Sequence, residues 1–351
     1  MSIVLGIESS CDETAIAVVE DGKHVLSSLV SSQISVHEVY GGVVPEIAAR
    51  EHLKAISPMF DAALAEAKIT SEDIDLIAVT QGPGLIGCLL VGVSFAKGLA
   101  CSLRKPLIPV DHVHAHLHGA LLGIADSNQL APSQQVFPCL AMVVSGGHTN
   151  LYYMEDELNF NLFATTIDDA CGECFDKVAK LLGFSYPGGP KIEKAASKGN
   201  SDRFSMPRMV QEKSRMEFSY SGLKTHMVNL KNKHGEFVEQ DLYDVCASFQ
   251  QEALGQLIRK IKFAYQKYPK AKSLIVAGGV AANSYFRDLV NKEIDLPAFF
   301  PGLAYCSDNA AMIASLGWHE YRAAQNCERF MEDQDWDAYS RYKFELYFQR
   351  N

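Results

Sequence analysis

The sequence lacks the features of several specialised protein classes. No apolar run reaches the roughly 20 residues that a membrane-spanning helix needs. The chain begins Met1-Ser2-Ile3-Val4-Leu5-Gly6, without the charged segment that opens a secretory signal peptide. The 9 cysteines are an odd number without framework spacing, which is typical of a reducing compartment. We therefore expect a cytoplasmic protein with no signal peptide and no membrane partner.

Basic residues are also scarce. Lys and Arg number 32 against 42 Asp and Glu, which gives a net charge of −10. This balance excludes a chain that binds nucleic acid over its whole surface. The stretch from Arg259 to Lys272 is an exception, because it is rich in Lys and Arg and contains no acid. It is either a solvated helix face or a patch that contacts phosphates.

The apolar residues indicate a duplicated architecture. At 351 residues and 48% hydrophobic content, the chain can bury a large core and is expected to form two lobes. A strand–turn–strand pattern opens the chain, with strands at Ile3–Glu8 and Ala15–Val19. The pattern returns near the middle, with strands at Leu140–Val144 and Leu151–Met154. This repetition indicates two copies of one α/β unit.

Glycine-rich corners follow the apolar strands. Leu76–Thr80 precedes Gly82-Pro83-Gly84 and then an apolar helix from about residue 87 to 100. Leu274–Ala277 precedes Gly278-Gly279 and a helix near Ala282. Turns of small residues let backbone N–H groups converge on an anion. We therefore predict an α/β, actin-like duplicated two-lobe fold with a nucleotide cleft between the lobes.

The expected lobes have simple boundaries. Residues 1–132 form the N-terminal lobe, and residues 133–307 form the C-terminal lobe. A helix from about residue 308 to 326 is expected to pack back on the first lobe. Residues 327–351 form an extension to which the patterns assign no role.

Four histidines stand at alternate positions, His112, His114, His116 and His118. On a helix, His112 and His116 share one face and can hold one metal ion, while His114 and His118 form a second such pair. Spacing alone does not choose between the pairs. Asp308 is a candidate third ligand, and its structural alternative is a helix N-cap.

Acidic residues form two further clusters. Asp12 and Glu13 lie in the first turn, where a carboxylate beside a phosphate site needs a metal ion or a proton. Asp169, Glu173 and Asp176 share one face if they are helical, without lysine neighbours on that face. These three either bind a ligand that relieves their repulsion or form a solvated helix start.

Short motifs occur along the chain in a fixed order: Glu8-Ser9-Ser10-Cys11-Asp12-Glu13-Thr14, Gly41-Gly42-Val43-Val44-Pro45-Glu46, Gly82-Pro83-Gly84-Leu85, His112 with His116, Ser145-Gly146-Gly147-His148-Thr149, Tyr186-Pro187-Gly188-Gly189-Pro190, Phe218-Ser219-Tyr220-Ser221-Gly222-Leu223-Lys224-Thr225, Gly278-Gly279-Val280-Ala281-Ala282-Asn283 and Cys306-Ser307-Asp308-Asn309. In this order they resemble the bacterial branch of the TsaD family of tRNA N6-adenosine threonylcarbamoyltransferases. The resemblance extends from about residue 3 to about residue 316.

The resemblance implies an actin-like fold and one divalent metal ion, Fe²⁺ or Zn²⁺, held by His112, His116 and Asp308. It implies that Asp12 and Glu13 take part in catalysis. It also places the co-substrate threonylcarbamoyl-AMP on a set of residues in the second lobe: Val143, Val144, Ser145, Gly146, Gly147, Asp176, Gly189 and Asn283.

The resemblance also implies a reaction and partners. The threonylcarbamoyl group would pass from threonylcarbamoyl-AMP to N6 of the adenosine 3′-adjacent to the anticodon, in tRNAs that read codons beginning with A. The implied partners are tRNA, a TsaB-like paralogue as heterodimer partner, a TsaE-like ATPase and a TsaC/Sua-type synthase that supplies the adenylate. Two features depart from the family: His114 replaces an acidic residue often found there, and residues from about Asp333 to Tyr347 differ from the usual short ending.

Three other functions are open to this sequence. An actin-like kinase or carbamoyltransferase acting on a small molecule would leave the histidine pair idle. A metalloendopeptidase is opposed by Val113, because the HExxH motif needs a glutamate general base directly after its first histidine. A nucleotide-gated scaffold would carry out no chemistry of its own.

Overall fold

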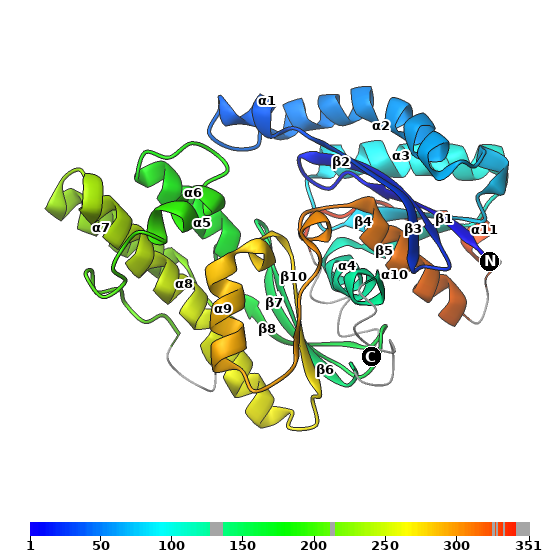
Figure 1. The fold of residues 1–351 in the computed structure, drawn as a ribbon. Helices are drawn as coiled ribbons and strands as arrows, with labels where there is room; N and C mark the ends of the chain where they lie inside the picture. The colour runs from blue at the N-terminus through cyan, green and yellow to red at the C-terminus, as the bar shows by residue number, and fades with distance from the viewer. Residues whose placement is uncertain (127–135, 211–214, 325–326, 328, 333, 342–351) are drawn as a thin grey trace. The chain divides into compact units, whose positions relative to one another are not determined.

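The computed structural model describes residues 1–126, 136–210, 215–324, 327, 329–332 and 334–341 (Figure 1). The chain divides into two compact units. Unit 1 consists of Met1–Gln129 and Asp308–Asn351, and unit 2 of Leu130–Ser307. The predicted lobe boundary at residue 132 lies outside the described residues.

Unit 1 is built on a five-stranded sheet of order β3-β2-β1-β4-β5. β1, β2 and β3 are antiparallel, whereas β1, β4 and β5 run parallel. Its central strands are mostly apolar and buried, because helices cover both faces of the sheet. The strand bounds are β1 Ile3–Glu8, β2 Glu13–Glu20, β3 His24–Ser32, β4 Leu76–Gly82 and β5 Leu107–Asp111.

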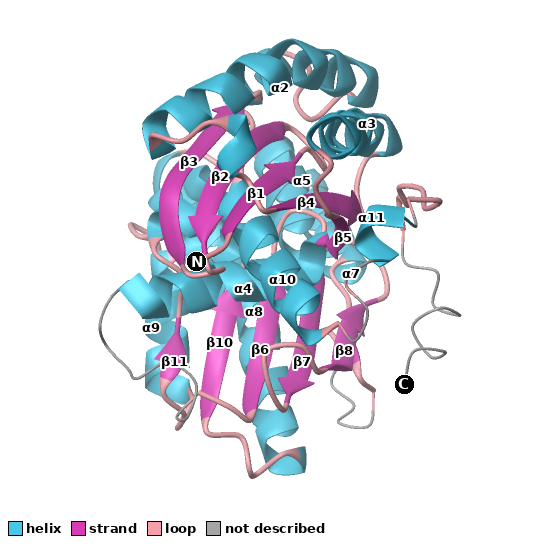
Figure 2. Ribbon diagram, turned by 90° about the vertical axis from the view of Figure 1, so that its right-hand side faces the viewer, coloured by secondary structure: helices cyan, strands magenta, loops and turns pink. Residues whose placement is uncertain are grey.

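Two layers of helices enclose this sheet (Figure 2). On one face lie α2, Pro45–Ala67, and α3, Ile86–Leu103. On the other lie α4, His112–Asp126, and α10, Ala310–Ala323, which pack against each other. Shorter helical segments complete the unit: α1 Ile34–Glu38, η1 Ser71–Asp73 and α11 Arg329–Glu332.

The helix α3 is the one helix in the described part of the chain that is long and apolar enough to cross a membrane. Its buried residues recur at helical spacing and face β4 and α2, as in a helix that covers a sheet. These residues are Cys88, Leu89, Gly92, Val93, Ala96 and Ala100.

The described part of the C-terminal extension packs on unit 1. Lys97 of α3 donates hydrogen bonds to the carbonyl oxygens of Gln334 and Trp336, at 2.9 and 2.7 Å. The Tyr339 hydroxyl donates to Oδ2 of Asp111 at 2.8 Å. The extension therefore reaches the end of β5, where α4 begins.

Unit 2 repeats the five-strand plan of unit 1 and adds one strand, β9, beside β8. Its sheet has the order β11-β10-β6-β7-β8-β9. β6, β7 and β8 are antiparallel and β6, β10 and β11 are parallel, as are their counterparts in unit 1. The predicted internal duplication is confirmed. The bounds are β6 Cys139–Val144, β7 Thr149–Met154, β8 Phe160–Thr166, β9 Glu217–Phe218, β10 Ser273–Ala277 and β11 Ala298–Phe299.

The helices of unit 2 enclose an apolar core around β6 and β10. The longest, α8, contributes many of its buried side chains, including Phe249, Leu254 and Leu257. The helix expected near Ala282 begins at Ser284, after a short 3₁₀ turn. The helical bounds are α5 Cys171–Leu181, α6 Gly189–Ala196, α7 Ser221–His234, α8 Glu239–Lys267, η2 Gly279–Ala282, α9 Ser284–Glu293 and η3 Leu303–Tyr305.

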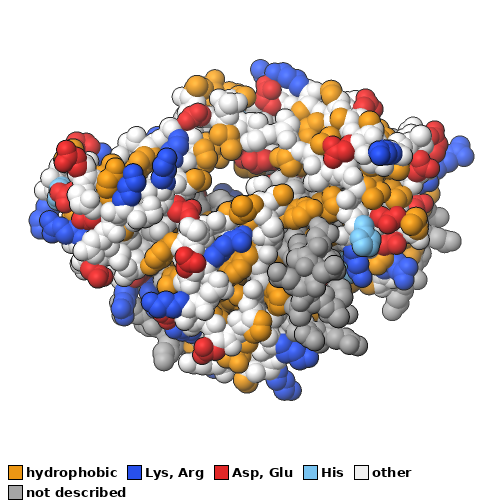
Figure 3. All heavy atoms as spheres, in the orientation of Figure 1, with side chains coloured by type: hydrophobic (Ala, Val, Ile, Leu, Met, Phe, Trp, Pro, Cys, Tyr) orange, Lys and Arg blue, Asp and Glu red, His pale blue; other side chains and the backbone are white. Residues whose placement is uncertain are grey.

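Part of the basic stretch from Arg259 to Lys272 is engaged by other groups of unit 2. Arg259 pairs with Glu252 at 2.6 Å and Lys262 with Glu293 at 2.7 Å. Lys260 is buried and donates to the carbonyl oxygen of Arg215. Glu252 and Glu293 therefore neutralise two of its basic residues, while Lys267, Lys270 and Lys272 are exposed. On the face drawn in Figure 3, acidic and basic side chains are interspersed.

Candidate functional site

The first candidate site lies where β5 passes into α4. Asp111 ends β5, and its Oδ1 accepts hydrogen bonds from the backbone N–H groups of Val113 and His114, at 2.9 and 3.0 Å. These contacts satisfy free N–H groups at the helix start. α4 therefore begins at His112, and one helical turn brings the His112 and His116 rings to a centroid distance of 4.8 Å.

Asp308 joins the two histidines from the other end of the sequence. Its Oδ1 lies 3.3 Å from Nε2 of His116 and 3.6 Å from Nε2 of His112. The N-cap of α10 is the next residue, Asn309, whose Oδ1 accepts from the Met312 N–H at 3.0 Å. Because Asn309 caps the helix, the Asp308 carboxylate can face the histidines.

The three side chains fit a divalent metal ion. Their ligand atoms lie within 4.8 Å of one another, so His112, His116 and Asp308 could hold one ion. His116 is 0% exposed, and within the described residues neither of its ring nitrogens makes a hydrogen bond, although Nε2 lies 3.3 Å from Asp308; an unsatisfied buried polar group is costly. A metal bond would satisfy one of these nitrogens. Two imidazoles and one carboxylate suit Zn²⁺ or Fe²⁺ and leave coordination positions open.

The other two histidines lie in different surroundings. His118 is fully buried, with Nδ1 at 3.4 Å from the Ser315 hydroxyl and its ring 5.0 Å from that of His319. His114 has Nδ1 at 3.8 Å from Oδ1 of Asp111, and burial lowers the pKa of its ring. The structure brings His112 and His116, not His114 and His118, to Asp308.

Sequence reasoning missed Glu8, which stands directly behind His112. Glu8 ends β1, is 0% exposed, and has Oε2 at 3.0 Å from Nδ1 of His112. Burial favours the neutral form of both groups, but their mutual attraction outweighs it, and the pKa of Glu8 is lowered. The carboxylates of Glu8 and Asp308 likewise raise the pKa of His112 to about 9 against the effect of burial. The available signal was a charged residue at the end of an otherwise apolar strand.

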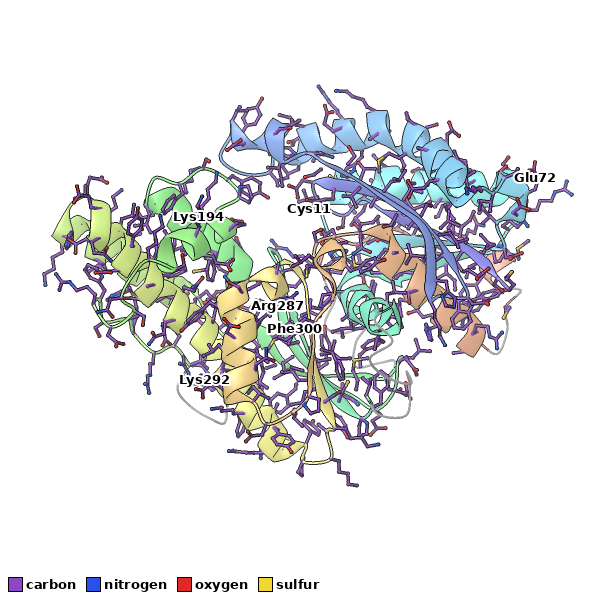
Figure 4. All side chains as sticks on the ribbon, viewed as in Figure 1. Cys11, Glu72, Lys194, Arg287, Lys292 and Phe300 are labelled. Atoms are coloured by element: carbon purple, nitrogen blue, oxygen red, sulfur yellow. The ribbon has the colours of Figure 1, made fainter. Side chains whose placement is uncertain are left out.

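Asp12 lies in the turn between β1 and β2, beside Cys11, which is labelled in Figure 4, and Glu13 is the first residue of β2. The turn is held from outside: His52 of α2 has Nε2 at 3.0 Å from the Cys11 carbonyl oxygen and Nδ1 at 2.7 Å from the Thr14 hydroxyl. Asp12 is only 5% exposed. Burial, followed by the negative charges of Asp308 and Asp12, raises the pKa of Glu13 to about 10. The acids therefore lie within electrostatic reach of Asp308.

The raised pKa of Glu13 predicts a pH-dependent stability. Unfolded glutamate releases its proton near its ordinary pKa of 4.5, whereas the folded metal-free protein keeps it up to about 10. The folded state then binds more protons than the unfolded state, so the contribution of Glu13 to stability falls as the pH rises through this window. Between pH 6 and pH 9, the melting temperature of the metal-free parent should fall more than that of Glu13→Gln. Thermal melts in EDTA test this, and equal slopes would contradict it.

The second group of predicted site residues gathers in unit 2. Ser145-Gly146-Gly147 forms the turn after β6, and the adjacent parallel strand β10 ends just before Gly278. The Ser145 N–H donates to the His148 carbonyl oxygen at 2.8 Å, which closes the turn. An added Cβ at Gly146 or Gly147 would meet no atom of the described residues within 4 Å. Packing does not require glycine at these two positions, and the space beside them is open.

The remaining predicted adenylate residues hold defined structural positions. Val143 and Val144 are buried in β6, so only their backbone can reach a ligand. Oδ1 of Asp176 accepts from the Gly188 N–H at 2.7 Å, just before Gly189 opens α6. Asn283 caps α9 through Phe286 N–H at 2.9 Å. Beyond this cap, Arg287 lies over the ring of Phe300 at 4.9 Å, as labelled in Figure 4.

The expected acidic face around Asp169 is wrong in two respects. α5 begins at Cys171, so Asp169 precedes the helix and does not share a helical face with Glu173 and Asp176. Lysines also lie close by: Lys177 is 2.7 Å from Asp169 and 2.8 Å from Glu173, and Lys224 is 2.6 Å from Asp169. The first turn of α7, distant in sequence, supplies Lys224, which local spacing did not reveal.

Comparison with known sequences shows extensive similarity. A family model described as "TsaD: tRNA N6-adenosine threonylcarbamoyltransferase" matches residues 24–315. A tRNA N6-adenosine threonylcarbamoyltransferase of Kosmotoga olearia is 48% identical over 321 residues, covering 90% of this chain and 93% of that protein. One of Syntrophomonas wolfei is 45% identical over 323 residues, covering 91% of this chain and 93% of that protein.

Comparison with solved structures supports the fold. HypF of T. kodakarensis matches with a TM-score of 0.60 at 15% identity, covering 94% of this chain and 49% of that chain. Component A of (R)-2-hydroxyglutaryl-CoA dehydratase from Acidaminococcus fermentans matches with a TM-score of 0.52 at 13% identity. The match covers 92% of this chain and 100% of that chain. At such identities the likeness concerns fold alone, and it confirms the predicted actin-like α/β class.

Proposed function

The chain belongs to the TsaD family and is a tRNA N6-adenosine threonylcarbamoyltransferase, and we propose that it works with a divalent metal ion on His112, His116 and Asp308 and with an adenylate bound by unit 2. The observation that carries the metal proposal is His116, fully buried without a hydrogen bond and facing Asp308. A metalloendopeptidase has no support, since the residue after His112 is the buried Val113.

The proposed donor is threonylcarbamoyl-AMP, a mixed anhydride of a carbamic acid and a phosphate. N6 of adenosine is a poor nucleophile, so the carbonyl carbon must be activated by a good leaving group. N6 forms a bond to that carbon, the bond from carbon to the phosphate oxygen breaks, AMP leaves, and the amine loses one proton. The protein then has to bind AMP, neutralise charge and position the amine. The proposed acceptor is the adenosine 3′-adjacent to the anticodon in tRNAs that read codons beginning with A.

Residues of unit 1 have two proposed tasks. His112, His116 and Asp308 would hold the ion, which supplies a Lewis acid and a template for substrate oxygens when bound. Asp12 and Glu13 would orient the reacting groups or receive the amine proton, for which phosphate and water are alternatives. Because Asp308 is one cause of the raised pKa of Glu13, a cation that neutralises Asp308 would lower that pKa and favour proton acceptance.

Residues of unit 2 would bind the adenylate. Backbone N–H groups of Ser145-Gly146-Gly147 can approach phosphate oxygens because no side chain intervenes. Gly189 has the same open space, and Asp176 and Asn283 place polar atoms at the starts of α6 and α9. Val143 and Val144 would contribute through their backbone.

Gly146→Val should abolish binding of AMP-type ligands with little change in melting temperature. The added side chain meets no protein atom at its Cβ but would occupy the space proposed for the phosphate. Gly278→Val is the matched control, because its Cβ would lie 2.4 Å from the Val144 carbonyl oxygen and its φ is +92°, so it should lower stability instead. Calorimetric titration with AMP and thermal melts provide the two readouts. Parental affinity in Gly146→Val would refute the placement.

We also propose how the chain assembles for the reaction. With a net charge of −10, it would bind tRNA weakly alone and share this task with a TsaB-like paralogue, aided by a TsaE-like ATPase. A TsaC/Sua-type synthase would supply the adenylate, and the cytoplasm is the proposed location. Modification of tRNA with threonine, bicarbonate and ATP, with each protein omitted in turn, tests the proposal. Modified tRNA formed without this chain would overturn it.

A further inference from the structure

We propose that Glu8 is a positioning residue for the metal site: it holds the His112 ring so that Nε2 faces Asp308 and the bound ion. This inference rests on the metal site of the proposed function and adds a residue outside the three candidate ligands. It is carried by the geometry of one buried carboxylate that joins β1, β4 and α4.

Both oxygens of Glu8 are engaged by donors. Oε1 accepts a hydrogen bond from the Ser10 N–H at 2.5 Å, and Oε2 accepts one from the Thr80 hydroxyl at 2.5 Å. Oε2 also lies 3.0 Å from Nδ1 of His112. Because Glu8 and Thr80 are both 0% exposed and belong to neighbouring strands of the sheet, the carboxylate has little freedom to move.

This arrangement determines which ring nitrogen of His112 carries the proton. An ionised carboxylate only accepts hydrogen bonds, so the Nδ1 that faces Glu8 must carry a hydrogen. A neutral imidazole then has its lone pair on Nε2, which is the nitrogen directed at Asp308, 3.6 Å away. A carboxylate behind a metal-binding histidine fixes the ring and increases its basicity, and loss of such a partner typically weakens metal binding 10- to 100-fold.

The two histidines differ in this support. Nδ1 of His116 is buried and makes no hydrogen bond, whereas Nδ1 of His112 faces Glu8. Within the described residues, Glu8 therefore supports His112, and no such partner supports His116. A glutamine at position 8 cannot reproduce this role. With its carbonyl oxygen on the Ser10 N–H, its NH₂ group would donate towards Nδ1 of His112 and favour the tautomer that carries the proton on Nε2.

The test compares Glu8→Gln with Ser27→Ala in the full chain. Ser27 is 2% exposed and donates a buried hydrogen bond to the Ala63 carbonyl oxygen. Like Glu8→Gln, Ser27→Ala therefore changes a buried hydrogen bond, but at a place away from the proposed metal ligands. Zn²⁺ affinity is measured by competition with a chromophoric chelator, and the visible spectrum is recorded after loading Co²⁺. Glu8→Gln should bind Zn²⁺ about 10- to 100-fold more weakly and show an altered Co²⁺ spectrum. Ser27→Ala should match the parent in both.

Thr80→Val provides a second variant if Glu8→Gln does not fold. It removes the hydroxyl that holds Oε2 but leaves the carboxylate, so it should weaken Zn²⁺ binding by a smaller factor than Glu8→Gln. Parental Zn²⁺ affinity in both variants, or in Thr80→Val when Glu8→Gln is unfolded, would overturn the role of Glu8 while the metal site stands. A parent protein that binds neither Zn²⁺ nor Co²⁺ would overturn the metal site itself.

Discussion

His116→Ala is expected to abolish stoichiometric metal binding and, with it, threonylcarbamoyl transfer. The substitution removes one of the three proposed ligands, so the affinity loss should exceed the 10- to 100-fold that follows from losing a residue that only supports a ligand. The metal-free protein should lose little stability. Nδ1 of His116 is buried and has no hydrogen-bond partner among the described residues, a state that costs about 1–3 kcal/mol, and its removal offsets part of the cost of the cavity.

The matched control is His118→Ala, on the same helix and equally buried at 0% exposure. It removes a ring of the same size that lies beside Ser315 and His319, outside the group formed with Asp308. Elemental analysis of the purified variants, with thermal melts of the metal-free forms, separates loss of a ligand from loss of packing. Equal metal loss in both variants would show that the wrong histidine pair has been chosen.

Asp12→Asn and Glu13→Gln are expected to fold and keep metal but to lose roughly 100-fold or more in transfer, the usual contribution of a positioned acid–base group. A structural aspartate in a turn can be replaced by asparagine at small cost. A carboxylate that orients the reacting groups or receives a proton cannot, because asparagine and glutamine carry no charge and accept no proton. Each tenfold loss corresponds to about 1.4 kcal/mol of transition-state stabilisation.

Single-turnover transfer from preformed threonylcarbamoyl-AMP to tRNA, with partners present, measures this effect. Glu20→Gln serves as the control, because Glu20 and Glu13 occupy opposite ends of the same strand, β2. It should transfer at the parental rate. If Asp12→Asn and Glu13→Gln also react within about threefold of the parent, both acids are turn residues, and the metal and backbone groups must account for the rate.

Much of the fold could be predicted from local sequence. The predicted strands at residues 3–8, 76–80 and 140–144 correspond to β1, β4 and β6 because each is an apolar run ended by polar or glycine residues. The duplication was visible because the same strand–turn–strand pattern recurs. The α5 region was predicted wrongly: helical spacing was applied to Asp169, which precedes the helix, and Lys224 comes from another element.

The sequence alone determined the strands, the glycine turns and the two histidine pairs, because periodicity and backbone sterics act between residues close in the chain. Only the tertiary structure brought His112 and His116 to Asp308 and placed Glu8 behind His112. These contacts depend on how β1, β4, α4 and α10 pack within unit 1. Since they join residues far apart in the chain, the buried core that positions those elements decides them, and no local pattern records them.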